Sequence, residues 1–250
     1  MDTGIADRIV VITGASRGLG RHLAVAFAEA GARVGLLARD GLALKKLASN
    51  LPGTAIPVAC DVSDPDAMVS AFATIEEQLG GIDSVVANAG VAPASGRAHR
   101  LEIDSWRATV EVNLTGSFLT ARAAYPYLAA SGRGGRLVLT SSVVARTPRP
   151  GMAAYTATKA GIEGLARALA AEWAREAITV NSVAPGFFDI GLGDAFASNE
   201  RLRAQVLSRT PLARFGLADE LANAVAYLAG DASGYVTGHV LALDGGYGLQ

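Results

Sequence analysis

The chain has 250 residues, half of them hydrophobic, and its 22 lysines and arginines nearly balance its 23 aspartates and glutamates. This balance argues against a nucleic-acid partner, and no apolar run is long enough to predict a membrane span. One cysteine and three scattered histidines leave no pattern for a disulfide framework or a metal site, so we expect a cytoplasmic, metal-independent protein without a signal peptide.

Short β-branched runs alternate with longer helical patterns along the chain. Strands are expected, in chain order, at 8–13, 33–37, 55–59, 84–88, 136–140, 178–183 and 240–246. Helices are expected at 18–30, 41–51, 65–79, 101–131, from around 153 to about 175, and 218–229. Near-continuous apolar strands separated by helices are typical of a parallel sheet covered on both faces. We predict one α/β domain over residues 1–250, a Rossmann-type, doubly wound parallel sheet of about seven strands with helices on both faces.

A glycine-rich segment, TGASRGLG (13–20), follows the first expected strand and opens the first expected helix. Gly14, Gly18 and Gly20 carry no side chain to block a tight turn or the close approach of a phosphate. The N-terminus of a helix adds unpaired N–H groups and a partial positive charge. We interpret the segment as the pyrophosphate site of a dinucleotide cofactor. The alternative is that the glycines serve only a turn.

The end of the second expected strand bears on which dinucleotide binds. Sites for NAD usually place an acid there for the ribose 2′-hydroxyl, whereas this chain has Ala38 followed by Arg39, with Arg17 in the glycine loop. Two guanidinium groups could hold a 2′-phosphate with charge-assisted hydrogen bonds. Asp40 is assigned to the start of the next turn. We predict NADPH/NADP+ in preference to NAD; the alternative is that Arg39 is a solvated surface charge.

Tyr155 and Lys159 stand four residues apart on an expected helix, so their side chains lie on one face of it. A neighbouring lysine favours the phenolate, and we expect Lys159 to lower the pKa of Tyr155 from its ordinary value of about 10. Such a group can exchange a proton with a carbonyl or an alcohol. Upstream, Ser142 ends the run GGRLVLTSS. By itself, the Tyr–Lys spacing is more typical of an exposed pair on an ordinary helix.

Several motifs occur together, and they are TGASRGLG, ANAG (87–90), Asn113 in VNLTGSF, Ser142, YTATK (155–159) and NSVAPG (181–186). With these motifs the chain resembles the short-chain dehydrogenase/reductase family, single-domain type, from Arg8 to Gly246. The C-terminal segments RTPLARFG, DELANAVAYLAG and YVTGHVLALDGG are similar to those of bacterial 3-oxoacyl-acyl carrier protein reductases and of sugar or polyol dehydrogenases. The resemblance implies an oxidoreductase that uses a nicotinamide cofactor.

The resemblance also implies catalytic roles for four residues. Tyr155 would be the general acid that protonates the carbonyl oxygen, and Lys159 would lower its pKa and bind the nicotinamide ribose. Ser142 would hydrogen-bond the substrate oxygen. Asn113 would sit at a helix kink and hold a water that links Lys159 to solvent; the alternative for Asn113 is an ordinary helix-breaking polar residue.

The cofactor set combines the glycine loop and the arginines with residues that the resemblance adds. Asp61 and Val62 would meet the adenine, residues 88–90 would line the adenosine ribose, and Pro185 and Gly186 would form the wall behind the nicotinamide. The alternative for Asp61 is a plain turn former. The whole expected set is Gly14, Ser16, Arg17, Gly18, Leu19, Gly20, Arg39, Asp61, Val62, Asn88, Ala89, Gly90, Tyr155, Lys159, Pro185, Gly186 and Phe188.

The chain departs from the family pattern at two places. Ala87 replaces a frequent second asparagine ahead of Asn88, which is expected to brace the central strands. Ile190 stands where the family commonly has a threonine that binds the nicotinamide carboxamide. Because the backbone of Phe188 could still hold that group, we expect an altered grip on the cofactor, with activity retained.

Substrate choice is expected to come from loops beyond the carboxyl ends of the strands, namely 91–99, 143–152 and a lid insertion at about 187–210. The lid is expected to be apolar through Phe187, Phe188 and Phe196, and mobile at Gly191 and Gly193. Arg146 or Arg149 could meet a distal anion of the substrate; the alternative is that both are solvated loop charges.

We predict an NADPH-dependent ketoreductase for a 3-oxoacyl thioester or a related small carbonyl, free or bound to a carrier protein. One alternative is a sugar or polyol dehydrogenase working oxidatively. A remote alternative, a non-catalytic dinucleotide-sensing scaffold, is disfavoured because such a protein has no need of all four catalytic residues. The alanine-rich helix around 153–172 is apolar on more than one side, and by resemblance we expect a homotetramer.

Overall fold

The computed structural model of the chain describes residues 3–92, 96–190 and 199–249. Within these ranges one seven-stranded parallel sheet has the order β3-β2-β1-β4-β5-β6-β7. Its strands are β1 (Ile9–Thr13), β2 (Arg33–Ala38), β3 (Ala55–Ala59), β4 (Ser84–Ala87), β5 (Arg136–Thr140), β6 (Thr179–Pro185) and β7 (Val240–Leu243). The predicted doubly wound α/β class is confirmed, and each expected strand is present with ends shifted by at most a few residues.

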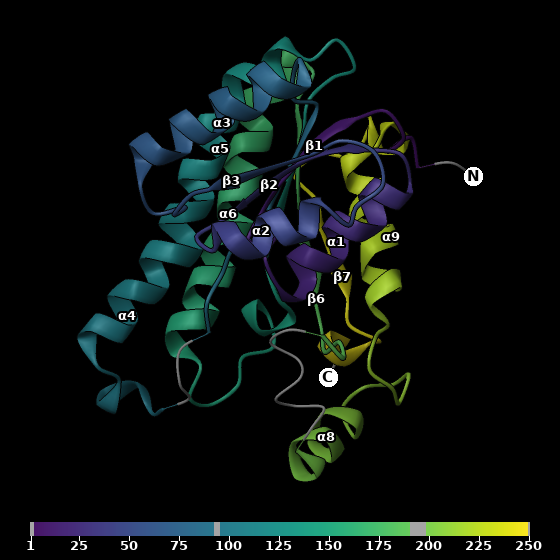
Figure 1. Cartoon of the computed structure of the whole chain (residues 1–250). Helices are drawn as coiled ribbons and strands as arrows, with labels where there is room; N and C mark the ends of the chain where they lie inside the picture. The colour runs from purple at the N-terminus through teal and green to yellow at the C-terminus, as the bar shows by residue number, and fades with distance from the viewer. Residues whose placement is uncertain (1–2, 93–95, 191–198, 250) are drawn as a thin grey trace.

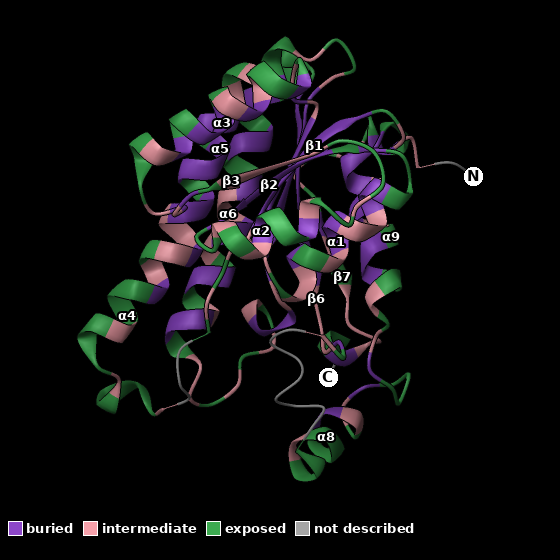
Figure 2. Cartoon of the chain, viewed as in Figure 1, coloured by how far each residue is buried: buried purple, intermediate pink, exposed green. Residues whose placement is uncertain are grey.

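Helices cover both faces of the sheet (Figure 1). One face carries α3 (Pro65–Leu79), α5 (Gly116–Ala130) and α6 (Ala153–Trp173). The other carries α1 (Gly18–Glu29), α2 (Gly41–Ala48) and α9 (Ala218–Ala229). Two further helices are α4 (Ile103–Val110) and α8 (Glu200–Leu207). The central strands are buried between these layers, whereas the edge strands β3 and β7 are only partly buried and the outward sides of the helices are exposed (Figure 2). No helix of the described ranges has the length and apolar character that crossing a bilayer requires.

Local chemistry explains where the helices begin and end, as α3 illustrates. The Asp64 carboxylate accepts hydrogen bonds from Asp66 N (3.0 Å) and Ala67 N (2.9 Å), which caps the first turn. Pro65 at the first helical position lacks only an N–H that would have no partner there. Gly80 ends the helix in the left-handed conformation, with φ of 79°. These signals are local, and the predicted range of 65–79 is confirmed.

Two helical regions differ from the predictions. The single helix expected at 101–131 is interrupted by a π-helical turn at Glu111–Thr115, so α4 and α5 are separate segments around Asn113. Such turns insert one residue into the helical hydrogen-bond ladder, often at functional sites. The segment expected as a lid contains a helix of its own, α8, whose first turn is capped by the Asn199 side chain accepting from Leu202 N.

The sheet order places the candidate site. Strand β1 lies between β2 and β4, and the chain crosses from one half of the sheet to the other between β3 and β4. At such a switch point the loops after neighbouring strands diverge, and α/β proteins bind ligands there. The glycine loop follows β1, and Asn88 follows β4, so both lie at this point.

Candidate active site

The glycine loop after β1 is shaped so that only glycine fits at its closest approaches. Gly14 and Gly18 have φ of 69° and 54°, in the left-handed region. A Cβ on Gly20 would lie 2.6 Å from Asn88 Nδ2. Arg17 is the N-cap of α1 but makes no side-chain cap hydrogen bond, and the first turn of α1 has no acidic residue. The loop therefore fits a pyrophosphate bound at a helix N-terminus.

Asn88 joins the two central strands at this loop. Its Nδ2 donates to Thr13 O (3.0 Å), and its backbone N donates to Thr13 Oγ1 (3.0 Å). Ala89 N donates to the same hydroxyl at 3.1 Å. Asn88 thus braces β4 against β1, as expected, and Ser16 and Leu19 occupy the same loop.

The end of β2 has the charge pattern that the sequence indicated. Asp40 accepts a hydrogen bond from Ala43 N (3.0 Å) and caps α2, so its carboxylate is used locally. Arg39 is exposed, and its Nη1 lies 3.9 Å from Asp61 Oδ2. Asp61 also accepts hydrogen bonds from the backbone and hydroxyl of Ser63, which hold its pKa below the usual value. Asp61 therefore holds the turn after β3, its Oδ2 lies toward Arg39, and its contact with the adenine stays a prediction.

Val62 is buried and packs against the start of α5, because a Cβ on Gly116 would lie 2.8 Å from Val62 Cγ2. Its side chain therefore fixes the loop after β3 onto a neighbouring helix.

The turn after β6 leaves room only for glycine at Gly186, since a Cβ there would lie 2.6 Å from Asp244 Cα. Pro185 is the last residue of β6 and leads directly into this close approach.

Three of the four expected catalytic residues meet between β5 and α6. Ser142 precedes a short 3₁₀ turn, Val143–Ala145, and its side chain lies near enough to the Tyr155 hydroxyl to affect the pKa of that group. Tyr155 and Lys159 lie on the buried side of α6, with exposed fractions of 9% and 3%. Lys159 Nζ donates to Thr140 O (2.7 Å) at the end of β5 and lies over the Tyr155 ring, 5.5 Å from its centroid.

Burial dominates the pKa values of this pair. It raises the pKa of Tyr155 to about 12, and the Ser142 side chain opposes the rise. It lowers the pKa of Lys159 to about 8. The prediction that Lys159 lowers the pKa of Tyr155 was therefore wrong for the chain by itself. The Lys159 ammonium faces the Tyr155 ring and the Thr140 carbonyl. For both Tyr155 and Lys159, the loss of hydration on burial outweighs the electrostatic stabilisation of the charged form by the other residue.

Asn113 lies beside this cluster, held by the π-helical turn. It is fully buried; its Oδ1 accepts from Val91 N (2.8 Å), and its Nδ2 donates to Val91 O (2.9 Å) and Thr158 Oγ1 (3.3 Å). A Cβ on Gly90 would be 3.3 Å from Asn113 Oδ1 and 3.7 Å from Lys159 Nζ. Gly90 is thus close to both the asparagine and the lysine, and a larger side chain there would contact both.

Comparison with known proteins agrees with this geometry. A family model described as enoyl-(acyl carrier protein) reductase matches residues 14–248. Cis-4-hydroxycyclohexanecarboxylate dehydrogenase of Sinomonas cyclohexanicum is 34% identical over 249 residues, 99% of each chain. A gluconate 5-dehydrogenase from Burkholderia cenocepacia, solved with NADP and tartrate, has a TM-score of 0.93 at 33% identity, covering 100% of this chain and 98% of that one. A 3-oxoacyl-[acyl-carrier protein] reductase with bound NAD from Brucella melitensis has a TM-score of 0.88 at 37% identity, covering 98% and 92%.

The chain belongs to the short-chain dehydrogenase/reductase family. It is an oxidoreductase of the kind that interconverts secondary alcohols and ketones with a nicotinamide dinucleotide. Within the described residues, no group of three or more His, Cys, Asp or Glu side chains could hold a metal ion.

The expected apolar lid of this short-chain dehydrogenase/reductase needs correction. Phe188 is 6% exposed and lies in the core, where its ring occupies the space that a side chain on Gly216 would need. Ile190 also packs against the core. Phe187 packs against the buried cluster that contains Tyr155. The remaining lid residues of the prediction, Phe196, Gly191 and Gly193, lie outside the described ranges.

The two expected loop arginines have different surroundings. Arg146 is not directed at a distal anion, because its Nε pairs with Glu163 Oε2 at 3.1 Å. Arg149 lies over the Phe187 ring, 5.6 Å from its centroid, so its expected contact with a distal anion stays a prediction.

Sequence reasoning missed several residues that support the short-chain dehydrogenase/reductase site. Glu163 follows Lys159 by one helical turn, so its place on the inner face of α6 could have been found from the spacing. Ser141 hydrogen-bonds Glu163, and Tyr247 packs with Tyr155. Nothing in the sequence around either residue indicates that it lies at the site. They meet the site only because distant strands and turns fold together.

Proposed function

We propose that the chain reduces a ketone to a secondary alcohol with NADPH, using Tyr155 as the general acid. The substrate would be a 3-oxoacyl thioester or a related small carbonyl. The observation that carries the proposal is the burial of Tyr155 beside Ser142, with Lys159 Nζ 5.5 Å from the centroid of its ring, on a phenol whose pKa is raised to about 12. Such a phenol is protonated at neutral pH, the state required for donating a proton to an oxygen that gains negative charge.

In this proposal the bound nicotinamide supplies the hydride, and the protein does the rest. N–H groups of the glycine loop would hold the pyrophosphate, and Lys159 would orient the ribose. Ser142 would donate to the carbonyl oxygen, which places that oxygen within reach of the Tyr155 hydroxyl. Asn113 would hold the water that returns a proton from solvent.

The preference for NADPH is supported by the charges after β2. The carboxylate of Asp40 is used in capping α2, and no acid ends the strand itself, because Ala38 is its last residue. Arg39 is exposed, with Asp61 3.9 Å away as its ion partner. A contact at this distance and exposure is weak, so a 2′-phosphate could replace it.

The first test measures turnover. Tyr155→Phe should lower kcat by roughly 10²–10⁴-fold and leave cofactor binding intact, because the ring remains in place. Full turnover by this variant would overturn the mechanism.

The second test measures cofactor choice by the fluorescence of reduced nicotinamide on binding. The protein should bind NADPH more tightly than NADH, and Arg39→Ala should remove the difference. Lys46→Ala, an exposed cation on α2, is the matched control and should retain it. Equal binding of both dinucleotides by the unmodified protein would sink the proposal of NADPH preference.

A second candidate, oxidation of a secondary alcohol, is favoured by the similarity to dehydrogenases of hydroxylated carboxylates. The same residues would then act in reverse, with Tyr155 accepting the proton. Rates in both directions, measured with matched alcohol and ketone pairs at equal saturation, separate the two candidates. Faster oxidation at neutral pH would favour the second candidate.

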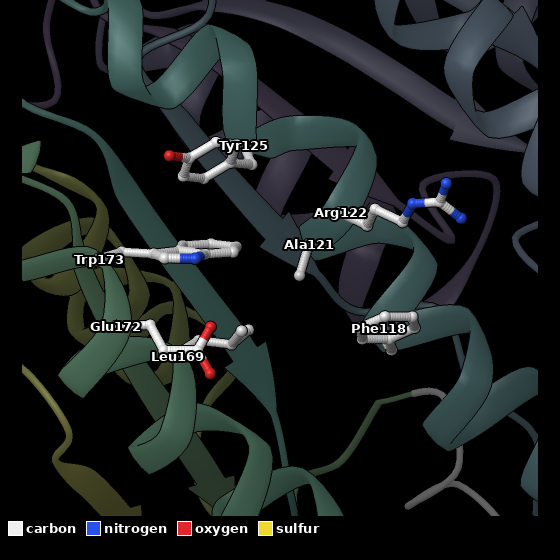
Figure 3. Close-up of a pocket in the computed structure, with 7 residues that line it drawn as sticks. All are labelled: Phe118, Ala121, Arg122, Tyr125, Leu169, Glu172 and Trp173. Atoms are coloured by element: carbon white, nitrogen blue, oxygen red, sulfur yellow. The ribbon is translucent and has the colours of Figure 1, made fainter.

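We also propose that the chain assembles with further copies of itself into a homotetramer. A pocket of about 230 Å³ between α5 and α6 is open at the surface and lined by Phe118, Ala121, Arg122, Tyr125, Leu169, Glu172 and Trp173 (Figure 3). Phe118 is 46% exposed. In the described ranges neither Arg122 nor Glu172 has an ion-pair partner, so a two-fold axis could pair them between subunits.

Light scattering of Arg122→Glu should show a smaller oligomer than the unmodified protein. The double variant Arg122→Glu/Glu172→Arg should restore the larger one. A monomeric unmodified protein would contradict this part of the proposal.

A further inference from the structure

Beside the catalytic tyrosine, three aromatic rings from separate segments are in contact, and each has an arginine over it. Phe187 lies 5.1 Å from Tyr247 and 6.5 Å from Phe215, measured between ring centroids. The guanidinium carbons lie 5.6 Å (Arg149 over Phe187), 4.7 Å (Arg209 over Tyr247) and 5.2 Å (Arg203 over Phe215) from the centroids. We call these six residues the arginine–aromatic row.

The row begins at the reaction centre. Tyr247 is fully buried in one cluster with Tyr155, Val143 and Val144, and Phe187 packs against that cluster. The arginine over Tyr247 is therefore only one ring away from the catalytic tyrosine. If the carbonyl of a small substrate lies at Tyr155, a charged substituent on the same molecule can therefore contact Arg209.

Two of the three arginines in the row have no ion-pair partner in the described part of the chain. Neither Arg203 nor Arg209 has a carboxylate there within ion-pair distance. Asp244, the acid nearest in sequence to Tyr247, accepts hydrogen bonds from Gly246 N (2.9 Å) and Gly248 N (2.8 Å). Like charges brought together raise the free energy of the site unless an anion joins them.

Two further features favour a bound anion. A guanidinium lying over an aromatic ring keeps its N–H edge available, and that edge matches a carboxylate in a bidentate fork. The Tyr247 hydroxyl is buried and has no hydrogen-bond partner. A buried donor without a partner is costly and rare, and a ligand oxygen would satisfy it.

We infer that the row is the carboxylate subsite of the substrate pocket, so that the protein acts on a short oxo acid or hydroxy acid. This inference rests on the proposed function and narrows its substrate class. Arg209 would bind the carboxylate, Tyr247 would hydrogen-bond it, and Arg149 and Arg203 would add to the positive potential. An uncharged analogue of the same shape lacks this interaction and binds more weakly.

The test compares two short oxo acids, acetoacetate and levulinate, with their methyl esters. Binding is measured by calorimetry on protein saturated with NADP+, and turnover is measured with NADPH. Unmodified protein should favour each acid over its ester. Arg209→Ala should reduce that preference by roughly tenfold to hundredfold, through KM and the dissociation constant for the acid. Tyr247→Phe should reduce it several-fold, and Arg209→Lys should restore part of it. Arg201→Ala, an exposed cation of the same helix region, is the control and should change nothing.

The outcomes separate this inference from the proposed function. Equal binding of acid and ester, or a preference that survives Arg209→Ala, overturns the carboxylate subsite even if the esters are reduced. If Arg209→Ala instead weakens acetoacetyl-coenzyme A and leaves acetoacetate unaffected, the row binds phosphates of a carrier arm, and the inference fails. Acid-selective binding that depends on Arg209 supports the subsite even where turnover is absent, in which case the proposed function fails alone.

Discussion

Ser141 Oγ lies 3.2 Å from Glu163 Oε1 and 3.0 Å from the carbonyl oxygen of Lys159. The serine directly precedes Ser142, and the glutamate lies one helical turn beyond Lys159, so this contact joins the two segments that carry the catalytic groups. Glu163 is 6% exposed and also pairs with Arg146. We therefore expect this carboxylate, which touches neither Ser142 nor Tyr155, to help set the distance between them.

Glu163→Leu should lower kcat roughly tenfold, because small displacements of catalytic groups are costly. Cofactor binding should stay within about twofold of the unmodified value, since the contact is remote from the glycine loop. Glu163→Gln retains an oxygen for Ser141 and should recover much of kcat. Steady-state kinetics and a cofactor titration on the same preparations provide the check. An unchanged kcat in Glu163→Leu would show that the contact has no positioning role.

Gly20→Ala should impair both folding and dinucleotide binding. The added Cβ would lie 2.6 Å from Asn88 Nδ2 and would press on the bracing of β1 and β4. We expect a loss of about 1–3 kcal/mol in the free energy of unfolding, measured by denaturant titration, together with weaker cofactor binding.

The matched control is Gly164→Ala on α6, where a Cβ would have no atom within 4 Å. Alanine is the better helix former there, so this variant should gain up to about 1 kcal/mol. Similar losses in both variants would refute the steric argument.

Lys159→Met should stabilise the protein at pH 7. Burial lowers the pKa of Lys159 to about 8 from an ordinary 10.5, so below pH 8 the folded state holds a charge at a cost of about 1–3 kcal/mol. Between pH 8 and 10.5 the unfolded chain binds this proton and the folded chain does not, so unmodified protein gains stability as pH rises. The difference between the two proteins should shrink across that window.

Thermal unfolding from pH 7 to pH 10 measures this difference. A constant offset between the unmodified protein and Lys159→Met would contradict the assignment of the low pKa to Lys159. Tyr155→Phe/Lys159→Met compared with Tyr155→Phe repeats the measurement without the tyrosine, which neighbours the lysine and titrates with it.

Arg8→Met should destabilise the protein without changing the kcat of the folded fraction. Arg8 is fully buried just before β1, at the amino ends of the strands, whereas the candidate active site lies at their carboxyl ends. It donates to Ser84 Oγ (2.9 Å), Asp83 O (3.1 Å) and Gly134 O (2.7 Å), and it pairs with Asp231. Removing one member of such a buried network costs about 3–5 kcal/mol.

Denaturant unfolding and kinetics at a temperature well below the transition check the Arg8 prediction. Arg107→Met, an exposed member of a surface pair on α4, is the control and should be nearly neutral. A loss of kcat per folded molecule in Arg8→Met would mean that this remote edge is coupled to the site.

The local parts of the fold and of the site were predictable. Apolar β-branched runs specify strands, and the carboxyl ends of parallel strands share one edge, so the glycine loop and Asn88 were expected to meet. The spacing of Tyr155 and Lys159 placed them on one helix face. Their roles remain predictions, because geometry alone does not measure turnover.

The features that were missed depend on long-range contacts. The π-helical turn exists where Asn113 bonds the backbone of Val91, more than twenty residues away in sequence. Phe188 turned inward because Gly216, from another segment, leaves room for its ring. No window of sequence around either residue contains its partner.

The sequence by itself determined the doubly wound sheet and the place of the glycine loop, because these follow from periodicity and residue type, and its resemblance to the family predicted which side chains are catalytic. Only the tertiary structure decided the direction of the pKa shifts of Tyr155 and Lys159, the link from Glu163 to Ser141, and the gathering of arginines over Phe187, Phe215 and Tyr247. Each of these depends on how much water is excluded and which distant groups become neighbours, and both are set when the helices and loops close over the sheet.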